Sequence, residues 1–306
     1  MMLELAVNVD NQRLDRFVAD ALPSLSRTEV QRLIKAGEIR VGGATVRPSY
    51  RLSVGETISV NLPPPRDRTI PAEPIPLDVI YEDADLVAIH KPAGMVVHPA
   101  HGSERGTLVN AALARWPEMR RVSGEERAGV VHRLDKDTSG VLVMGKTPAA
   151  LKALQAQFKA RTVTKRYVAL VEGIPESSRG VIDAPIGRDP RQRKRMAVIP
   201  QGRPAITHYA VAEMFAAHSL LDVEPLTGRT HQIRVHLAWL GHPVVGDRVY
   251  GRRKPGIPLP NRIFLHAAEL QVDSPSTGKR LIFLAPLPAE LVAVLDDLRR
   301  ANPPTW

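Results

Sequence analysis

The sequence predicts an α+β protein in which a small N-terminal α/β domain precedes a larger domain built on a mixed, mostly antiparallel sheet. Segments with strand patterns outnumber helical segments and rarely alternate with them regularly, which disfavours a doubly wound parallel sheet. Residues 61–78 contain six prolines, so they can form neither a helix nor a central strand and instead act as a spacer. We therefore expect domains at residues 1–62 and 77–306, joined by a Pro-rich linker at residues 63–76.

The N-terminal domain is predicted to contain two helices and a small sheet. The first helix places five apolar side chains on one face: Leu14, Phe17, Val18, Ala21 and Leu22. A second helix is predicted to begin at Ser26, with Glu29 completing a capping box, and to end at Gly37. Residues 38–46 resemble a strand, a Gly-Gly turn and a second strand, and residues 50–60 contain a further turn and strand.

The larger domain begins with two predicted strands on either side of a turn at Glu82 and Asp83. Apolar runs at Val130-Val131 and at 141–144 indicate buried strands that flank a charged segment. Further strands are predicted within residues 164–173, 206–228, 262–272 and 280–288. Helices are predicted within residues 106–116, 148–162, 229–241 and 289–301.

The composition favours a nucleic-acid partner. The formal net charge is +10 and the isoelectric point is about 10.1, and excess positive charge attracts polyanions. The run Arg188–Arg195 concentrates five basic residues, and it either contacts RNA or is a solvated loop. Without cysteine, a signal-peptide pattern or a long apolar run, the chain is expected in the cytoplasm, with no membrane contact.

Several common active sites are excluded by their missing motifs. The sequence has neither G-x-x-x-x-G-K-[ST] nor G-x-G-x-x-G, so nucleotide-cradle chemistry has no support. Ser139, His132 and Asp135 are close in sequence, but Ser139 is not on a nucleophile elbow. The histidines lack metal-ligand spacing and there are no thiolates, so no metal is expected.

The segment 129–146 sets two acids among basic groups between the apolar runs. Asp137 precedes Thr138-Ser139-Gly140, which is good turn chemistry, so a structural role explains it. Asp135 has no such explanation, and its neighbours Arg133 and Lys136 favour its ionised form. A structural ion pair is the alternative for any single acid of this kind.

The N-terminal domain resembles the S4 RNA-binding domain over residues 13–60. The resemblance is carried by two short helices, a glycine and the following segment "IRVGGATVRPSYRLSVGETISV". That family binds structured RNA with its second helix and the loop after it. The resemblance therefore implies Arg27, Arg32 and Lys35 as candidate RNA contacts.

Four motifs of the larger domain resemble the RluA/RluD family of RNA pseudouridine synthases, in the family's order. They are "HKPAGMVVHP" from residue 90, "HRLDKDTSG" from residue 132, "KRYVALVEG" from residue 165 and "LTGRTHQIRVHLAWLGHPVVGDRVYG" from residue 226. Together with the S4-like domain the resemblance spans nearly the whole chain. It implies the pseudouridine synthase fold for the larger domain.

The resemblance also implies roles for individual residues. Asp135 matches the catalytic acid, Arg229 the arginine placed against it, and Tyr167 the tyrosine that packs on the flipped base. Ile233 matches the apolar residue that closes the pocket. Arg133 is expected to fill the gap left by the target base or to bind a neighbouring phosphate.

We therefore expect an isomerase of the intramolecular-transferase type that converts specific uridines of RNA to pseudouridine. The reaction is balanced within one nucleotide, so no cofactor is required. Asp135 acts as nucleophile or base: it attacks the sugar, attacks the uracil, or abstracts a proton from the ribose. The resemblance implies large-subunit (23S) ribosomal RNA as substrate, free or in a pre-ribosomal particle, and a monomeric enzyme. Transfer RNA, another ribosomal site and a non-catalytic ribosome-assembly factor remain alternatives, whereas a glycoside hydrolase would need a second carboxylate.

Overall fold

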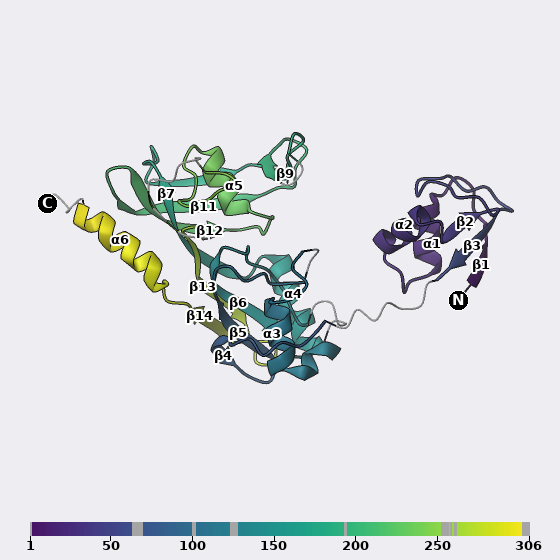
Figure 1. The fold of residues 1–306 in the computed structure, drawn as a ribbon, viewed down its shortest axis with the longest axis horizontal. Coiled ribbons are helices and arrows are strands. Elements are labelled where there is room, and N and C mark those ends of the chain that lie inside the picture. The colour runs from purple at the N-terminus through teal and green to yellow at the C-terminus, as the bar shows by residue number, and fades with distance from the viewer. Residues whose placement is uncertain are drawn as a thin grey trace. The chain divides into compact units, whose positions relative to one another are not determined.

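The computed structural model describes residues 2–62, 70–99, 102–122, 128–192, 195–251, 257, 259 and 262–301. The chain separates into two compact units, Met1–Arg68 and Thr69–Trp306, which are described one at a time (Figure 1). The division falls within the expected linker at residues 63–76, of which residues 63–69 lie outside the described residues.

The N-terminal unit packs two helices against a three-stranded antiparallel sheet of order β1-β3-β2. Its elements are β1 (Met2–Ala6), α1 (Leu14–Ala21), α2 (Arg27–Lys35), β2 (Ile39–Val41) and β3 (Thr57–Asn61). Apolar side chains from both helices and the sheet form one core, in which Leu14, Val18 and Ile34 are fully buried. This core holds the two helices against the sheet.

Local signals account for most of this unit. The Ser26 hydroxyl accepts a hydrogen bond from the Glu29 amide at 3.2 Å, as predicted for the start of α2. Gly37 has φ +75° and ends the helix, also as predicted. The prediction of a strand after the Gly-Gly turn is wrong, because Ala44 forms only an isolated bridge to Val41. The third strand of the sheet is β1, which was not predicted and which pairs with β3.

The larger unit is an α+β fold on a nine-stranded mixed sheet, which confirms the predicted fold class. Its strands are β4 (Asp78–Glu82), β5 (Leu86–Lys91), β6 (Ser139–Gly145), β7 (Thr164–Glu172), β8 (Arg179–Asp183), β11 (Ile206–Met214), β12 (His218–Pro225), β13 (Leu265–Asp273) and β14 (Arg280–Leu284), with a separate hairpin of β9 (Ile186–Arg188) and β10 (Met196–Val198). Its helices are α3 (Leu108–Arg115), η1 (Pro117–Arg121), a 3₁₀ turn, α4 (Pro148–Ala160), α5 (Gln232–Trp239) and α6 (Ala289–Ala301).

The sheet runs in the order β4-β5-β6-β13-β7-β12-β11-β8, with β14 paired to β13. All pairs are antiparallel except β6 with β13. Helix α3 lies by the half of the sheet that contains β5 and β6, and α5 lies by the half that contains β11 and β12 (Figure 1). The parallel contact between β6 and β13 therefore joins two separately packed halves.

This junction depends on a glycine. Gly140 has φ +122°, and a Cβ there would lie 2.2 Å from the carbonyl oxygen of Ala267 on β13. Beside it the Ser139 hydroxyl bonds to His266 Nδ1 at 2.8 Å and accepts from Arg262 Nη2 at 2.9 Å. These buried contacts fix the start of β6, directly after the segment that carries Asp135.

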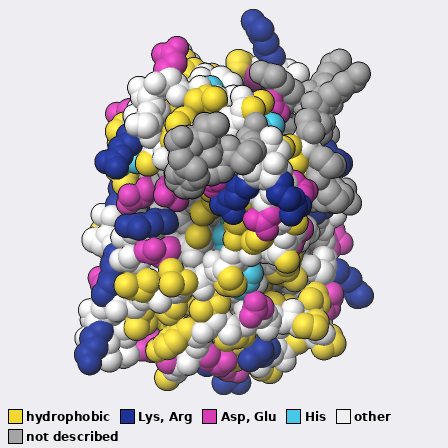
Figure 2. Space-filling view, turned by 90° about the vertical axis from the view of Figure 1, so that its left-hand side faces the viewer, with side chains coloured by type: hydrophobic (Ala, Val, Ile, Leu, Met, Phe, Trp, Pro, Cys, Tyr) yellow, Lys and Arg dark blue, Asp and Glu magenta, His cyan; other side chains and the backbone are white. Residues whose placement is uncertain are grey.

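Figure 2 shows one end of the larger unit, where basic and acidic side chains of the described residues are interspersed. The positive charge of the chain is therefore not gathered on this face. No helix in the described part of the chain combines the length and apolar character needed to cross a bilayer.

Candidate active site

A cavity of about 490 Å³ opens between the segment before β6, the C-terminal end of α4, strand β7 and the segment that leads into α5. Its basic lining residues are Arg133, Lys159, Arg161, Lys165, Arg229 and Arg234. Among the lining residues that the structure describes, Asp135 is the only acid. The basic side chains of the lining favour the binding of a polyanion, and Asp135 provides a single carboxylate inside the cavity.

Asp135 lies on an irregular segment rather than between two strands. Of the two predicted strands, β6 is observed and fully buried, whereas Val130 forms only an isolated bridge to Met144. The Asp135 carbonyl accepts from the Thr138 amide at 3.2 Å, and the next carbonyl, of Lys136, accepts from the Gly94 amide at 2.8 Å. Backbone hydrogen bonds therefore hold the segment in place of a strand ladder.

The side chain of Lys91 also holds this segment in place. Its side chain is completely buried, and its ammonium donates to the carbonyls of Lys136 at 3.2 Å, Pro92 at 2.8 Å and Met95 at 2.9 Å. Burial lowers the pKa of Lys91 to about 7, although the negative charges of Asp135 and Asp137 oppose this. Lys91 therefore joins the segment that carries Asp135 to the loop after β5.

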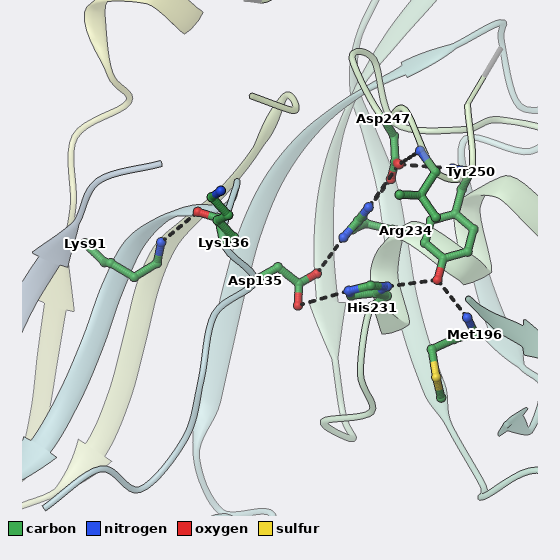
Figure 3. A network of polar contacts seen from close by, with 9 residues as sticks. Lys91, Asp135, Lys136, Met196, His231, Arg234, Asp247 and Tyr250 are labelled. Carbon is green, nitrogen blue, oxygen red and sulfur yellow. Dashed lines mark hydrogen bonds and ion pairs between the residues drawn. The ribbon is translucent and has the colours of Figure 1, made fainter. Parts of the chain in front are cut away.

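The arginine that pairs with Asp135 is Arg234, on α5 (Figure 3). Its Nη1 lies 3.2 Å from Asp135 Oδ2, while Nε and Nη2 lie 2.6 and 3.0 Å from the two oxygens of Asp247. Burial alone would lower the pKa of Arg234, but the hydrogen bonds and charge of Asp247, with those of Asp135, raise it overall. One guanidinium therefore bridges two carboxylates, and its fork geometry suits that task.

The expectation that Arg229 faces the acid is corrected by this geometry. Arg229 precedes α5 in a loop, and its Nε donates to the carbonyl of Pro204 at 3.0 Å. Arg234 lies within the helix and is only 6% exposed, so its side chain points into the interior. Both arginines belong to "GRTHQIR", but only Arg234 lies within α5 and reaches Asp135.

His231 forms a second, longer contact with the acid. Its Nε2 lies 3.9 Å from Asp135 Oδ1, and its Nδ1 lies 2.9 Å from the hydroxyl of Tyr250. The Tyr250 hydroxyl also accepts from the Met196 amide at 3.0 Å, so it links His231 to the strand β10 (Figure 3). Burial lowers the pKa of His231, and the charge of Asp135 opposes this shift.

Tyr167 and Ile233 form the apolar part of the cavity. Tyr167 lies on β7, and burial, reinforced by the charge of Asp135, raises its pKa well above the usual value for tyrosine. Its hydroxyl is therefore a donor at neutral pH. Ile233 is 6% exposed and packs on α5 against the β7 side of the sheet, while Arg133 lines the cavity from an exposed position.

His132 is a structural residue. Its Nε2 accepts from the Val143 amide at 3.0 Å, and its ring stacks on Phe158 with centroids 4.7 Å apart. Burial lowers the pKa of His132 to about 3, with a smaller contribution from Lys165. Ser139 bonds to His266, so no triad forms with His132 and Asp135.

The predicted contacts of the S4-like unit are partly engaged within the protein. Arg27 donates to Asp15 at 3.0 Å, and Arg32 pairs with Glu29 at 2.7 Å. Asp15 is completely buried, and its hydrogen bonds with Arg13, then Gln31 and Arg27, hold its pKa well below the usual range. Arg27 therefore also has a structural role, whereas Lys35 is exposed in the last turn of α2.

The basic run at 188–195 begins with the last residue of β9, and the structure describes residues 188–192 and Arg195 of it. The Asp189 side chain accepts from the amides of Arg191 and Gln192 at 2.8 and 3.2 Å. The Arg195 guanidinium lies 5.1 Å from the ring of Tyr250, beside the network of His231. Arg193 and Lys194 lie outside the described residues.

The sequence interpretation missed several residues of the site: Lys165, His231, Arg234, Asp247 and Tyr250. Asp247 and Tyr250 lie in "GDRVYG", the end of the fourth motif, and that motif was the signal that could have found them. For metal binding, the described residues contain no cluster of three or more His, Cys, Asp and Glu side chains.

Comparison with known proteins bears on this site. The sequence profile described as RNA pseudouridylate synthase matches residues 85–239, and that of the S4 domain matches residues 12–58. An uncharacterized RNA pseudouridine synthase of Chloroflexus aurantiacus is 54% identical over 288 residues, 94% of this chain and 90% of the relative.

Two further relatives extend the comparison to a named enzyme and to a solved structure. Ribosomal large subunit pseudouridine synthase D of Nitrosomonas europaea is 45% identical over 307 residues, 97% of this chain and 88% of the relative. The solved structure of human RNA Pseudouridylate Synthase Domain Containing 1 has a TM-score of 0.57 at 30% identity, covering 77% of this chain and 99% of that chain.

Proposed function

Because this chain belongs to the RNA pseudouridylate synthase family and carries an S4 domain, we propose that Asp135 is the catalytic group of its isomerase reaction on RNA. The family membership confirms both resemblances that the sequence motifs carried. The observation that supports the proposal for Asp135 is its position as the sole acid among the described lining residues of a basic cavity, held by Arg234 at 3.2 Å.

The reaction needs one carboxylate that is ionised and fixed in place. The N1–C1′ bond of a uridine breaks, the C5–C1′ bond forms, the C5 proton leaves and N1 gains a proton. Arg234 pairs with the ionised Asp135 carboxylate and orients it, and Asp247 in turn orients Arg234. Since the atoms balance within one nucleotide, we propose that the reaction uses no cofactor.

The surrounding groups suit a flipped base. A uridine must leave its stack to reach Asp135, which costs a few kcal/mol and needs a receiving surface. Tyr167 and Ile233 present an apolar surface in the same cavity, and we assign them to packing on the uracil. Arg133 and Arg229 also lie in the lining, and we assign them to phosphates beside the target.

We propose large-subunit ribosomal RNA as the substrate. Two relatives at 45% and 42% identity are named ribosomal large subunit pseudouridine synthase D, which supports this target. The S4 domain supplies a second contact to structured RNA, through Lys35 and the exposed parts of Arg27 and Arg32. A cytoplasmic enzyme that acts on nascent ribosomal RNA follows from this proposal.

The experiment that tests the proposed function is pseudouridine mapping of total cellular RNA, by chemical adduct and reverse-transcription stops. A deletion strain is compared after complementation with wild type and with Asp135→Asn. We expect particular ribosomal stops to vanish on deletion and to return only with wild type. Stops that change only in transfer RNA refute the ribosomal target, and full restoration by the Asn variant refutes the role of Asp135.

A further inference from the structure

Lys165 lies in the cavity beside the groups already described, on the same strand as Tyr167. The two residues are two positions apart on β7, so their side chains point to the same side of the sheet. Both line the cavity with Asp135. A cationic donor therefore stands next to the surface assigned to the uracil.

The ammonium of Lys165 is poorly satisfied by the protein. Among the described residues its one hydrogen bond goes to the carbonyl of Thr227, at 3.4 Å. Burial lowers the pKa of Lys165 to about 8, with Glu224 opposing and Arg161 reinforcing the shift. A partly buried ammonium with donors to spare is costly unless a ligand completes its shell. Lys91 is the contrast, because its ammonium has three carbonyl partners.

The position of Lys165 indicates which part of the RNA it would contact, a base or a phosphate. The exposed cations of the lining are Arg133, Lys159 and Arg161, which suits them to the RNA backbone at the entrance. Lys165 is more buried than these and adjoins the apolar surface of Tyr167. This position suits Lys165 to a contact with a nucleobase rather than with a phosphate.

We propose that Lys165 donates a hydrogen bond to a carbonyl oxygen of the flipped uracil and stabilises the negative charge that this ring carries during the isomerisation. The inference rests on the proposed function. When the N1–C1′ bond breaks, its electron pair stays with the uracil and is shared with the carbonyl oxygens. If Asp135 instead attacks the uracil ring, charge reaches the same oxygens. Lys165 forms and breaks no covalent bond in either case, and acts as an oxyanion-type donor.

The test compares Lys165→Met, Lys165→Arg and wild type on total RNA from a deletion strain labelled with uridine carrying tritium at C5. Formation of the C5–C1′ bond releases the tritium to water, so the single-turnover rate at saturating RNA reports the chemistry. We expect Lys165→Met to lower this rate about 100-fold and to change the apparent Kd for RNA less than about threefold. Lys165→Arg should recover part of the rate. Lys152→Met, on the exposed face of α4, is the charge-matched control.

Each outcome decides the proposal. A fall in Tm for Lys165→Met together with the lost rate assigns Lys165 a structural role, whereas our account predicts an unchanged or higher Tm because a poorly paired charge is removed. Weaker binding with an unchanged saturating rate assigns it to phosphate and overturns the contact with uracil. A rate equal to wild type also overturns it. If wild type releases no tritium, the proposed function itself fails.

Discussion

The contacts of Arg234 lead to the most specific prediction about the site. Its guanidinium holds Asp247 with two nitrogens and Asp135 with the third, over distances of 2.6 to 3.2 Å. Arg234→Lys keeps the positive charge but replaces the planar fork with a single ammonium. One ammonium cannot reproduce all three contacts, so we expect the substituted side chain to stay with the buried Asp247 and to release Asp135.

The size of the effect follows from the bond that is lost. A hydrogen bond between charged groups contributes about 1.5–3 kcal/mol. Each 1.36 kcal/mol corresponds to a factor of about ten in rate, so losing the contact to Asp135 should lower the rate about 10- to 160-fold. The protein should remain folded, because the carboxylate of Asp247 keeps a cationic partner and the amide bonds from Val249 and Tyr250.

The assay is tritium release under single-turnover conditions, with Arg229→Lys as the matched variant. Arg229 lies in the loop before α5 and donates to Pro204 rather than to Asp135. We expect Arg229→Lys to act on RNA affinity and its salt dependence, with a change in the saturating rate of less than about threefold. The reasoning is refuted if Arg229→Lys loses the larger part of the rate and Arg234→Lys keeps it.

Two further predictions concern stability. His132 has a folded pKa of about 3 against an ordinary value of 6.5, so the unfolded chain binds its proton first and stability falls as pH drops from about 6.5 towards 3. Urea unfolding at a series of pH values should show His132→Gln losing up to about 1.4 kcal/mol per pH unit of this slope, and an unchanged slope contradicts the assignment. Gly140→Ala should cost about 3 kcal/mol or more, because its φ of +122° and the carbonyl of Ala267 both exclude a side chain. Gly94→Ala, at φ +87° but in open space, should cost only about 1 kcal/mol by thermal unfolding, and equal losses would show that the contact with β13 is unimportant.

Local rules predicted the parts of the fold that local physics decides. Alternating and continuous apolar patterns located β5, β7 and β13, and the cap at Ser26 fixed the start of α2. Strand pairing is decided by distant partners, so β1 and the isolated bridge at Val130 were not predicted. Val130 belongs to an apolar run of the kind found in strands, but it forms only a single bridge to β6, at Met144.

The site was predictable as a set of motifs but not as a geometry. Asp135, Tyr167 and Ile233 line one cavity, although they are distant in sequence. The sequence analysis assigned Arg229 alone to Asp135, whereas Arg234 makes the contact, because α5 begins at Gln232 and helix boundaries are the least certain part of a sequence interpretation. Asp247 was not predicted, because its contact with Arg234 can be recognised only when the position of Arg234 is known.

The central claim is that the carboxylate of Asp135 performs the chemistry, and Asp135→Asn tests it most directly. Asparagine keeps the shape and can still accept a hydrogen bond from Arg234 but has no charge, and Asp137→Asn provides a neighbouring control. On labelled RNA under single-turnover conditions, we predict that Asp135→Asn binds RNA like wild type and releases no tritium, while Asp137→Asn keeps its activity. Tritium release by Asp135→Asn at the wild-type rate would contradict the account.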